Sequence, residues 1–356
     1  MSSRTIRLLA LAATALLTAT ALTACGGDDE AASGDANAEA SAIRLGYFPN
    51  ITHTPALIGV NKGFFQEALG STTKLDAKTF NAGPAALEGL LSGAIDATYI
   101  GPNPAINGWA QSKGAALKII AGSTSAGAGL VVKPTITTAA DLKGKKIATP
   151  QLGNTQDVAL RAWLKQNGLN ADAQGGGDVS VLPQDNATIL QAFAQGAIDG
   201  AWVPEPYFSR LQIESGGKVL VNEKDLWPNG QFVTTHLIVS QTFLKKYPAT
   251  VKKLLQGHLK ALDYIKTDNA GAQKAANAQL EALSGKPLKD NVLAASFQNL
   301  SFTADPIASS LFTSAQHAQD VGLLKPVDLK GIYDLGPLNE LLKAAGQPEV
   351  SDAAAS

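Results

Sequence analysis

The side chains that could do chemistry in this sequence include two carboxylates in a repeated tetrapeptide. Gly-Ala-Ile-Asp occurs at residues 93–96 and again at 196–199, so Asp96 and Asp199 are candidates for a general acid and base. Each Asp, however, lies between a predicted helix end and a predicted strand start, where Asp commonly turns the chain and bonds nearby amides. We therefore interpret both as architectural, at the sheet edge opposite the ligand.

The remaining reactive residue types are too scattered to predict a catalytic or metal centre. The sequence has four His residues and one Cys, and they do not have the spacing of metal ligands. It contains neither a Gly-x-Ser-x-Gly elbow nor a phosphate-binding P-loop. The net charge of -1 comes without a cluster of Lys and Arg, which excludes a nucleic-acid partner. We expect no enzyme, no metal and no cofactor.

Two short polar stretches have the composition of an anion site. Both Asn50–Pro55 (NITHTP) and Gly153–Asp157 (GNTQD) follow a predicted strand and begin a predicted helix. Free backbone N–H groups and the helix dipole make such a position suitable for an anion. The alternative is that the polar side chains only cap their helices. The candidate ligand-binding residues in these stretches are Asn50, Thr52, His53, Thr54, Asn154, Thr155 and Gln156.

Four further candidates follow or end other predicted strands. Prolines around Asn103 and Glu205 stiffen the chain there, although proline is also ordinary at a helix start. Ser123 belongs to a hydroxyl-rich loop, and Trp202 is either an apolar wall of the site or a core residue. The Glu205 carboxylate suits an amine on the ligand, or it pairs with a cation of the facing lobe.

These stretches are positioned by two similar runs of alternating strands and helices. From residue 42 the pattern reads strand, helix, strand, helix, and it restarts after residue 131. When the sequence is aligned with itself at an offset of 103 residues, Leu87 aligns with Leu190 and the two Gly-Ala-Ile-Asp tetrapeptides align with each other. Such alternation predicts α/β lobes with parallel strands covered by helices on both faces. Ligands bind beyond the carboxyl ends of such strands, so we expect a cleft between two facing lobes.

The first 41 residues differ in composition and pattern from the rest of the chain. Arg4 and Arg7 precede an apolar run over residues 8–22, which predicts a signal peptide; the run is too short for a confident membrane-spanning helix. Residues 22–25 (LTAC) resemble a bacterial lipobox, which implies lipidation of Cys25; the alternative is a chance Cys near a signal peptide. With no second Cys an intramolecular disulfide is excluded.

The predicted organisation follows from these patterns. The acidic, small-residue stretch after Cys25 has no periodicity and reads as a flexible tether. The domain prediction is a signal peptide over 1–24, a tether over 25–41, a first lobe over 42–130 and 235–345, a second lobe over 131–234, and a disordered tail over 346–356.

Four stretches together resemble a known family. They are IRLGYFPNITHTPALIGVNKGFF, GLLSGAIDATYIGPNPAI, DLKGKKIATPQLGNTQDVALRAWLKQNGL and VSQTFLKKYPATVKKLL. They are similar to the solute-binding proteins of bacterial sulfonate, taurine and nitrate ABC importers. The resemblance implies a type II-like periplasmic-binding-protein fold: two lobes, each a mixed, mainly parallel sheet flanked by helices, around a ligand cleft.

The resemblance also implies a role. We expect a monomeric lipoprotein, exported and held by Cys25 at the outer face of the cytoplasmic membrane. It would deliver a small oxyanion, an aliphatic sulfonate or a taurine-like zwitterion, to an ABC permease with its ATPase. The alternatives are a heteroaromatic ligand such as a thiamine-precursor pyrimidine, stacked on Tyr47, Trp109 or Trp202, an enzyme on the same fold, and a lipid-anchored sensor without a permease.

Overall fold

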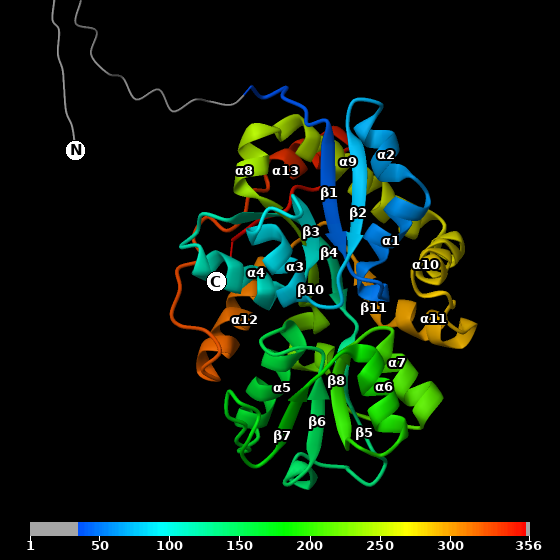
Figure 1. Cartoon of the computed structure of the whole chain (residues 1–356), viewed down its shortest axis with the longest axis vertical. Coiled ribbons are helices and arrows are strands. Elements are labelled where there is room, and N and C mark those ends of the chain that lie inside the picture. Colours follow the sequence, from blue (N-terminus) through cyan, green and yellow to red (C-terminus); the bar gives the residue numbers. More distant parts are fainter. Residues whose placement is uncertain (1–34, 354–356) are drawn as a thin grey trace, which may run out of the picture. The chain divides into compact units, whose positions relative to one another are not determined.

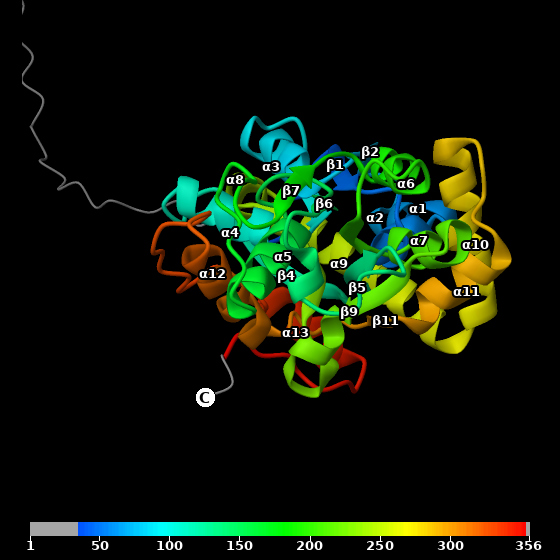
Figure 2. The ribbon, with the colours of Figure 1, turned by 90° about the horizontal axis from the view of Figure 1, so that it is seen from below.

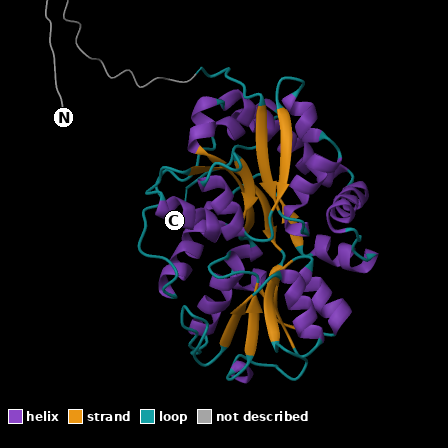
Figure 3. Cartoon of the chain, in the orientation of Figure 1, coloured by secondary structure: helices purple, strands orange, loops and turns teal. Residues whose placement is uncertain are grey.

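The computed structural model describes residues 35–353, which fold around two β-sheets covered by helices (Figures 1 and 3). The strands of the first sheet are β1 (Ala42–Tyr47), β2 (Lys74–Thr79), β3 (Ala97–Ile100), β4 (Leu117–Ala126), β10 (Val233–Ser240) and β11 (Leu300–Phe302). Those of the second sheet are β5 (Ala128–Val132), β6 (Lys146–Thr149), β7 (Ser180–Pro183), β8 (Gly200–Pro204) and β9 (Lys218–Asn222).

The two sheets share one strand order. The first reads β2–β1–β3–β10–β4, with β11 added beside β4, and the second reads β7–β6–β8–β5–β9. In both, the first three strands are parallel and the fourth is antiparallel to its two neighbours. Four strands of each sheet therefore run in one direction. This confirms the predicted fold of two α/β lobes with mixed, mainly parallel sheets.

Helices cover both sheets. The first lobe contains α1 (Thr54–Asn61), α2 (Phe64–Leu69), α3 (Gly83–Leu91), α4 (Pro102–Gln111), α8 (Gln241–Lys246), α9 (Pro248–Thr267), α10 (Asn269–Ser284), α11 (Asp290–Gln298), α12 (Ala308–Asp320) and α13 (Gly336–Ala344). The second contains α5 (Thr155–Gln166), α6 (Asn186–Ala194) and α7 (Tyr207–Ser215). Short 3-10 helices are η1 (Ile51–His53), η2 (Ala140–Leu142), η3 (Glu223–Leu226) and η4 (Pro228–Gly230). Within residues 35–353, every helix lacks the length or apolarity of a membrane span.

The chain crosses between the lobes at Gly127. β4 ends at Ala126 and β5 begins at Ala128, so a single residue with φ 72° joins the two sheets. The predicted boundary after residue 130 therefore falls inside β5. The return boundary, predicted after residue 234, also falls inside a strand, because β10 of the first sheet begins at Val233. Both errors arise because a strand of one lobe continues almost directly into a strand of the other.

Parts of both predicted flexible ends are bonded to the first lobe. Ala40 is buried, and its N–H donates to Thr250 Oγ1 at 2.8 Å. At the other end, Val350 N donates to Asn339 Oδ1 and Asn339 Nδ2 donates to Val350 O, both at 2.9 Å. The tether and tail predictions are therefore wrong for these residues, because their backbone groups find partners on helices α9 and α13. The predicted signal peptide (residues 1–24) and Cys25 lie outside the described residues.

The repeated tetrapeptides occupy equivalent places in the two lobes. Gly93 and Gly196 follow α3 and α6 with φ 72° and 74°, the left-handed conformation that ends many helices. Asp96 N donates to Arg44 O at 2.9 Å while Asp96 Oδ2 accepts from Arg44 N at 2.8 Å. Asp199 makes the same two bonds with the backbone of Lys146. Both Asp residues thus tie two strands together, as an architectural role requires.

Candidate anion-binding cleft

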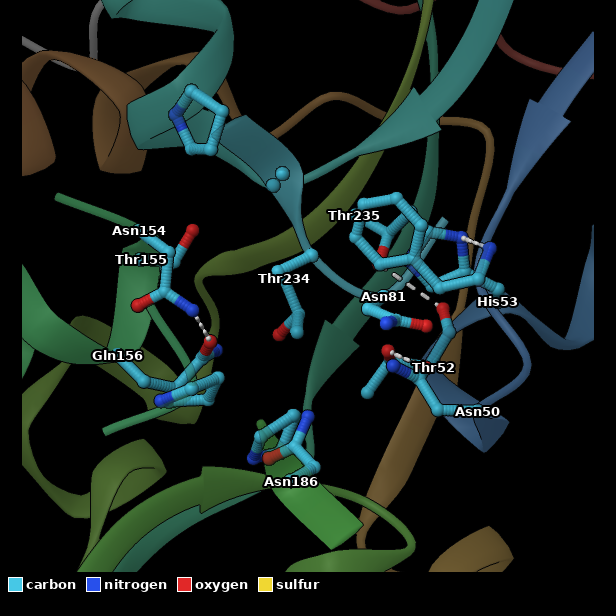
Figure 4. A pocket seen from close by; sticks show the side chains of 17 residues that line it. Asn50, Thr52, His53, Asn81, Asn154, Thr155, Gln156, Asn186, Thr234 and Thr235 are labelled. Atoms are coloured by element: carbon cyan, nitrogen blue, oxygen red, sulfur yellow. Dashed lines mark hydrogen bonds between the residues drawn. The ribbon is translucent and has the colours of Figure 1, made fainter. Parts of the chain in front are cut away.

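Loops at the carboxyl ends of six strands meet in one cleft between the lobes (Figure 4). The first lobe contributes residues that follow β1, β2 and β3, and the second contributes residues at the ends of β6, β7 and β8. The cleft has about 410 Å³ of empty volume, including solvent at its mouth. Its position is the one that the strand-end rule for α/β sheets predicts.

Six of the candidate residues line this cleft, three from each lobe. They come from the two helix starts identified in the sequence: Asn50, Thr52 and His53 before α1, and Asn154, Thr155 and Gln156 at the start of α5. Figure 4 shows the two groups facing the same space. All six side chains are nearly buried. The structure therefore brings together residues that lie about a hundred positions apart in the sequence.

Hydroxyl groups hold the loop of the first lobe in place. Thr52 Oγ1 donates to Asn50 Oδ1. The backbone carbonyl of Thr52 accepts from Thr124 Oγ1 at 2.7 Å and from Thr235 Oγ1 at 3.0 Å. Because these partners lie on β4 and β10, the central strands of the sheet fix the position of the loop. The Asn50 amide nitrogen is then available on the cleft side of the loop.

His53 is a neutral hydrogen-bond donor at this site. Its ring stacks on Phe48 with centroids 4.2 Å apart, and its Nδ1 atom accepts from Phe48 N at 3.2 Å. An accepting Nδ1 places the proton of a neutral imidazole on Nε2. Burial lowers the pKa of His53 to about 3, so the ring carries no charge at neutral pH. It can offer an N–H to a ligand, but it cannot supply a positive charge there.

The loop of the second lobe is capped and internally neutralised. Asn154 Oδ1 accepts from Asp157 N at 2.9 Å, so the predicted capping role and a place in the cleft coincide. The buried Asp157 carboxylate accepts from Thr149 Oγ1 at 2.8 Å and from Gly153 N at 3.0 Å. It also pairs with the buried Arg161, Nε to Oδ2 at 3.0 Å. The charge of Asp157 is therefore balanced inside the lobe.

Four other candidates lie outside the cleft, because each side chain is bonded elsewhere or buried inside its strand. Thr54 Oγ1 donates to a carbonyl of η1 at 2.6 Å, and Asn103 Nδ2 donates to a carbonyl of α12 at 3.2 Å. Ser123 is fully buried within β4. Trp202 is also fully buried, with Nε1 donating to Glu223 Oε2 at 2.7 Å. Sequence position alone did not reveal which way these side chains turn.

Glu205 was expected in the cleft and is instead a buried link between the lobes. Its Oε1 atom accepts from Asn299 Nδ2 at 2.7 Å and its Oε2 atom accepts from Ser296 Oγ at 2.9 Å. Ser209 on α7 donates to it as well. Burial raises the pKa of Glu205, and these hydrogen bonds oppose the rise. Among residues 35–353 no Lys, Arg or His forms an ion pair with this carboxylate. It joins α7 to α11, which lie side by side in Figures 1 and 2.

The sequence reasoning missed several lining residues. Asn81 and Asn186 lie where α3 and α6 begin, and Thr234 and Thr235 come from the start of β10. Within the described residues, the buried Oδ1 atom of Asn186 has no hydrogen-bond partner. Both Asn residues could have been found, because they follow strands β2 and β7 in the same way that Asn50 and Asn154 follow β1 and β6. The two Thr residues carry no such signal.

The cleft combines many polar groups with no formal charge. Among the described residues that line it, none is Asp, Glu, Lys or Arg. Five side-chain amides, four threonine hydroxyls and neutral His53 surround the space. Helices α3, α5 and α6 begin at its edge, so their free N–H groups and dipoles favour negative charge there. The arrangement suits a small anion held by neutral donors.

A family model decides the relationship of this chain to known proteins. The model described as the NMT1-like family matches residues 36–280. The chain belongs to the NMT1-like family. This NMT1-like chain is 26% identical over 298 residues to the taurine-binding periplasmic protein of Escherichia coli (strain K12), covering 81% of the chain and 90% of the relative.

Solved structures share the fold of this NMT1-like protein. The alkanesulfonate-binding protein of Xanthomonas axonopodis pv. citri bound to MOPS has a TM-score of 0.71 at 23% identity, covering 84% of this chain and all of the other. The nitrate-binding protein of Synechocystis PCC 6803 has a TM-score of 0.70 at 16% identity, covering 88% and 91%. The resemblance to solute-binding proteins and the periplasmic-binding-protein fold are thereby confirmed.

Proposed function

We propose that this protein is an extracytoplasmic solute-binding protein that captures a small oxyanion in the cleft and delivers it to an ABC importer. The observation that carries the proposal is a cleft of neutral donors at the N-termini of three helices. The relatives support it, because proteins named for taurine, alkanesulfonate and nitrate binding share the family or the fold.

The ligand that fits best is an aliphatic sulfonate without an amine. A sulfonate stays ionised at all physiological pH values and needs only donors. An ammonium group, as in taurine, needs a negative charge to balance it in a buried setting, and the described cleft lining offers it only neutral acceptors such as Asn186 Oδ1. Glu205, the one carboxylate expected in the cleft, is bonded between α7 and α11. Taurine is therefore expected to bind no more tightly than ethanesulfonate, which has the same sulfonate and two-carbon chain and lacks the amine.

A heteroaromatic ligand is disfavoured by the positions of the aromatic rings. Trp109 Nε1 donates to a carbonyl near α13, Trp202 Nε1 donates to Glu223, and Tyr47 Oη accepts from Gln279. None of these three rings lines the cleft. The two rings that do, Phe48 and His53, stack on each other. An enzymatic role is disfavoured as well, since a histidine with a pKa of about 3 is a poor general base at neutral pH.

Binding of a panel of ligands tests the proposal. Isothermal titration of the purified protein with methanesulfonate, ethanesulfonate, taurine, nitrate and an aminopyrimidine should give the tightest binding with a sulfonate. Binding of the pyrimidine without any anion would overturn the proposal. Consumption of a ligand during the titration would point to an enzyme instead.

A charge-adding variant separates binding from folding. Asn154→Asp keeps a good helix cap, so the melting temperature should stay near that of the wild type. The new carboxylate should nevertheless repel an anion and lower its affinity about tenfold or more. The matched control is Asn167→Asp, because Asn167 lies at the opposite end of the same helix. Equal loss in both variants would contradict a site at the start of α5.

We also propose that Cys25 is lipidated and anchors the exported protein to the membrane. The lipobox-like residues 22–25 support this proposal. Metabolic labelling with an alkyne fatty acid in the native host should label the wild type and not Cys25→Ala. The variant should be released into the soluble fraction. Labelling that survives the substitution would contradict the anchor.

A further inference from the structure

A second pocket, separate from the cleft, is lined by residues of α5 in the second lobe and α12 in the first. These two helices pack against each other and lie side by side in Figures 1 and 2. Its empty volume is about 620 Å³, including solvent at its mouth. Trp163, Trp202 and Trp227 line it together with Glu223, and α12 contributes His317. The sequence contains four Trp residues. Three of them therefore line one pocket together with one carboxylate, although they lie at separate places in the sequence.

The aromatic rings form two walls of this pocket. Trp163 and Trp202 lie 6.2 Å apart between ring centroids, with planes inclined by 57°. Trp227 is backed by Phe232, which stacks on it at 5.3 Å, and has His317 beside it at 5.8 Å. Such large rings are positioned by stacking and packing contacts and do not need to reorganise around an occupant. Their electron-rich faces attract cations.

Glu223 brings an unbalanced carboxylate to the same place. Its side chain is 2% exposed, and its Oε2 atom accepts from Trp202 Nε1 at 2.7 Å. Within residues 35–353 no Lys, Arg or His forms an ion pair with it. Burial raises the pKa of Glu223 to about 7, although the indole N–H groups favour the charged form. A buried carboxylate without a cation is costly unless something balances it.

We infer that this pocket binds a small organic cation with a methylated ammonium group, held by the rings of Trp163 and Trp227 and the Glu223 carboxylate, with the fully buried Trp202 behind them. Aromatic rings beside a carboxylate match that chemistry, because the methyl groups are apolar and the charge is spread over them. A bare ammonium or a metal ion would need several oxygen partners, and the described lining offers chiefly rings and aliphatic side chains.

The neighbouring groups leave room for a positive charge. Burial lowers the pKa of His317, with Asp320 opposing the shift, which favours the neutral imidazole. Lys165 lies two residues after Trp163, and its ammonium group donates a hydrogen bond to the backbone carbonyl of Asp320. Because the walls come from both lobes, an occupant would touch both and favour the arrangement of lobes seen here.

Titration with choline tests the inference. At about pH 8 the Glu223 carboxyl is mostly ionised, given its pKa of about 7. Choline and tetramethylammonium should give heat in isothermal titration and change the indole fluorescence. The neutral analogue 3,3-dimethyl-1-butanol has the shape of choline without its charge and should bind far more weakly. Equal binding of the neutral analogue, or no binding of either cation at tens of millimolar, would overturn the inference.

Variants then locate the site. Glu223→Gln keeps an acceptor for Trp202 and should lower choline affinity about tenfold or more, because the charge is lost in a buried setting. Asp225→Asn, an exposed residue of the same 3-10 helix, is the matched control and should leave affinity unchanged. Asn154→Asp in the main cleft should also leave choline binding intact. Retained affinity in Glu223→Gln, with circular dichroism showing the native fold, would refute the site; loss in Asn154→Asp would place the cation in the main cleft and refute it too.

Discussion

Gly101 is a position where the two lobes lie in close contact beside the cleft. A methyl group added to Gly101 would place its Cβ 2.3 Å from Thr155 Oγ1, whereas ordinary contacts begin at about 3.4 Å. Gly101 precedes α4 of the first lobe and Thr155 is the first residue of α5 of the second. Its backbone, with φ -71° and ψ 162°, is one that alanine adopts readily. Gly101→Ala should therefore leave each lobe folded and obstruct their approach.

The magnitude follows from the overlap. The lobes or the Thr155 side chain must move by about 1 Å, and overpacking of this kind costs about 1–3 kcal/mol. Anion affinity in Gly101→Ala should therefore fall about 5- to 150-fold. Isothermal titration with the anion that the wild type binds best gives the affinity. The melting temperature of the free protein shows whether the fold is intact.

A second substitution identifies the cause. Thr155→Ala removes the hydroxyl and leaves a Cβ atom 3.5 Å from the added methyl group, an ordinary contact. Adding Gly101→Ala to Thr155→Ala should then cost much less affinity than adding it to the wild type. Wild-type affinity in the single Gly101→Ala variant would refute the reasoning. So would an equal loss in the two backgrounds, because the obstruction would then not involve Thr155.

Four other variants test separate parts of the structure. Asn186→Ala should lower anion affinity about tenfold in titration, because it removes a side-chain amide donor from the cleft. The melting temperature should stay nearly unchanged, because the Oδ1 atom has no partner to lose within the described residues; a large loss of stability would contradict this. Glu205→Ala should lower the free energy of unfolding in urea by about 1–3 kcal/mol, since it leaves buried donors unpaired. It should leave anion affinity unchanged, because Glu205 lies outside the cleft; weaker anion binding would contradict this. The pKa of Glu223 is raised from 4.5 to about 7, so the stability that its protonated form contributes should be lost as pH rises through that window. Glu223→Gln cannot titrate, so its free energy of unfolding in urea should depend less on pH than that of the wild type. An unchanged pH profile would argue against a buried carboxyl. Asp199→Asn removes a partly exposed ion pair and should cost less than about 1 kcal/mol, with anion affinity equal to that of the wild type; weaker binding would reopen a functional role for the tetrapeptide.

The fold was predictable from the sequence because its signals are local. Helix starts at Asn154 and helix ends at Gly93 and Gly196 depend on capping and backbone conformation, which neighbouring residues determine. The alternation of strands and helices then follows. Strands β5, β9 and β11 were not predicted, because short edge or crossing strands carry little periodicity of their own.

The cleft was predictable only in part, because side-chain direction depends on partners far along the chain. Asn50 and Asn154 reach the cleft as the strand-end rule predicts. Asn103 obeys the same rule but turns to the carbonyl of Ser314, which lies 211 residues later. Glu205 turns to Ser296 and Asn299 for the same reason. The residues around Asn103 and Glu205 do not reveal these partners, which lie about 90 to 210 residues further along the chain.

The one-residue crossing at Gly127 limits the kinds of movement that the lobes can make. An added Cβ there would meet Leu300 Cδ2 at 2.1 Å, and Gly127 O accepts from Glu205 N at 2.8 Å. A joint so short and so closely packed cannot lengthen, so any movement of one lobe relative to the other would be a swing about this joint and not a slide along it. The displacement of any point on the second lobe then grows with its distance from Gly127. A pair of fluorophores placed at the far rims of the cleft would therefore report ligand capture with the largest signal, and a pair beside β4 and β5 would report almost none.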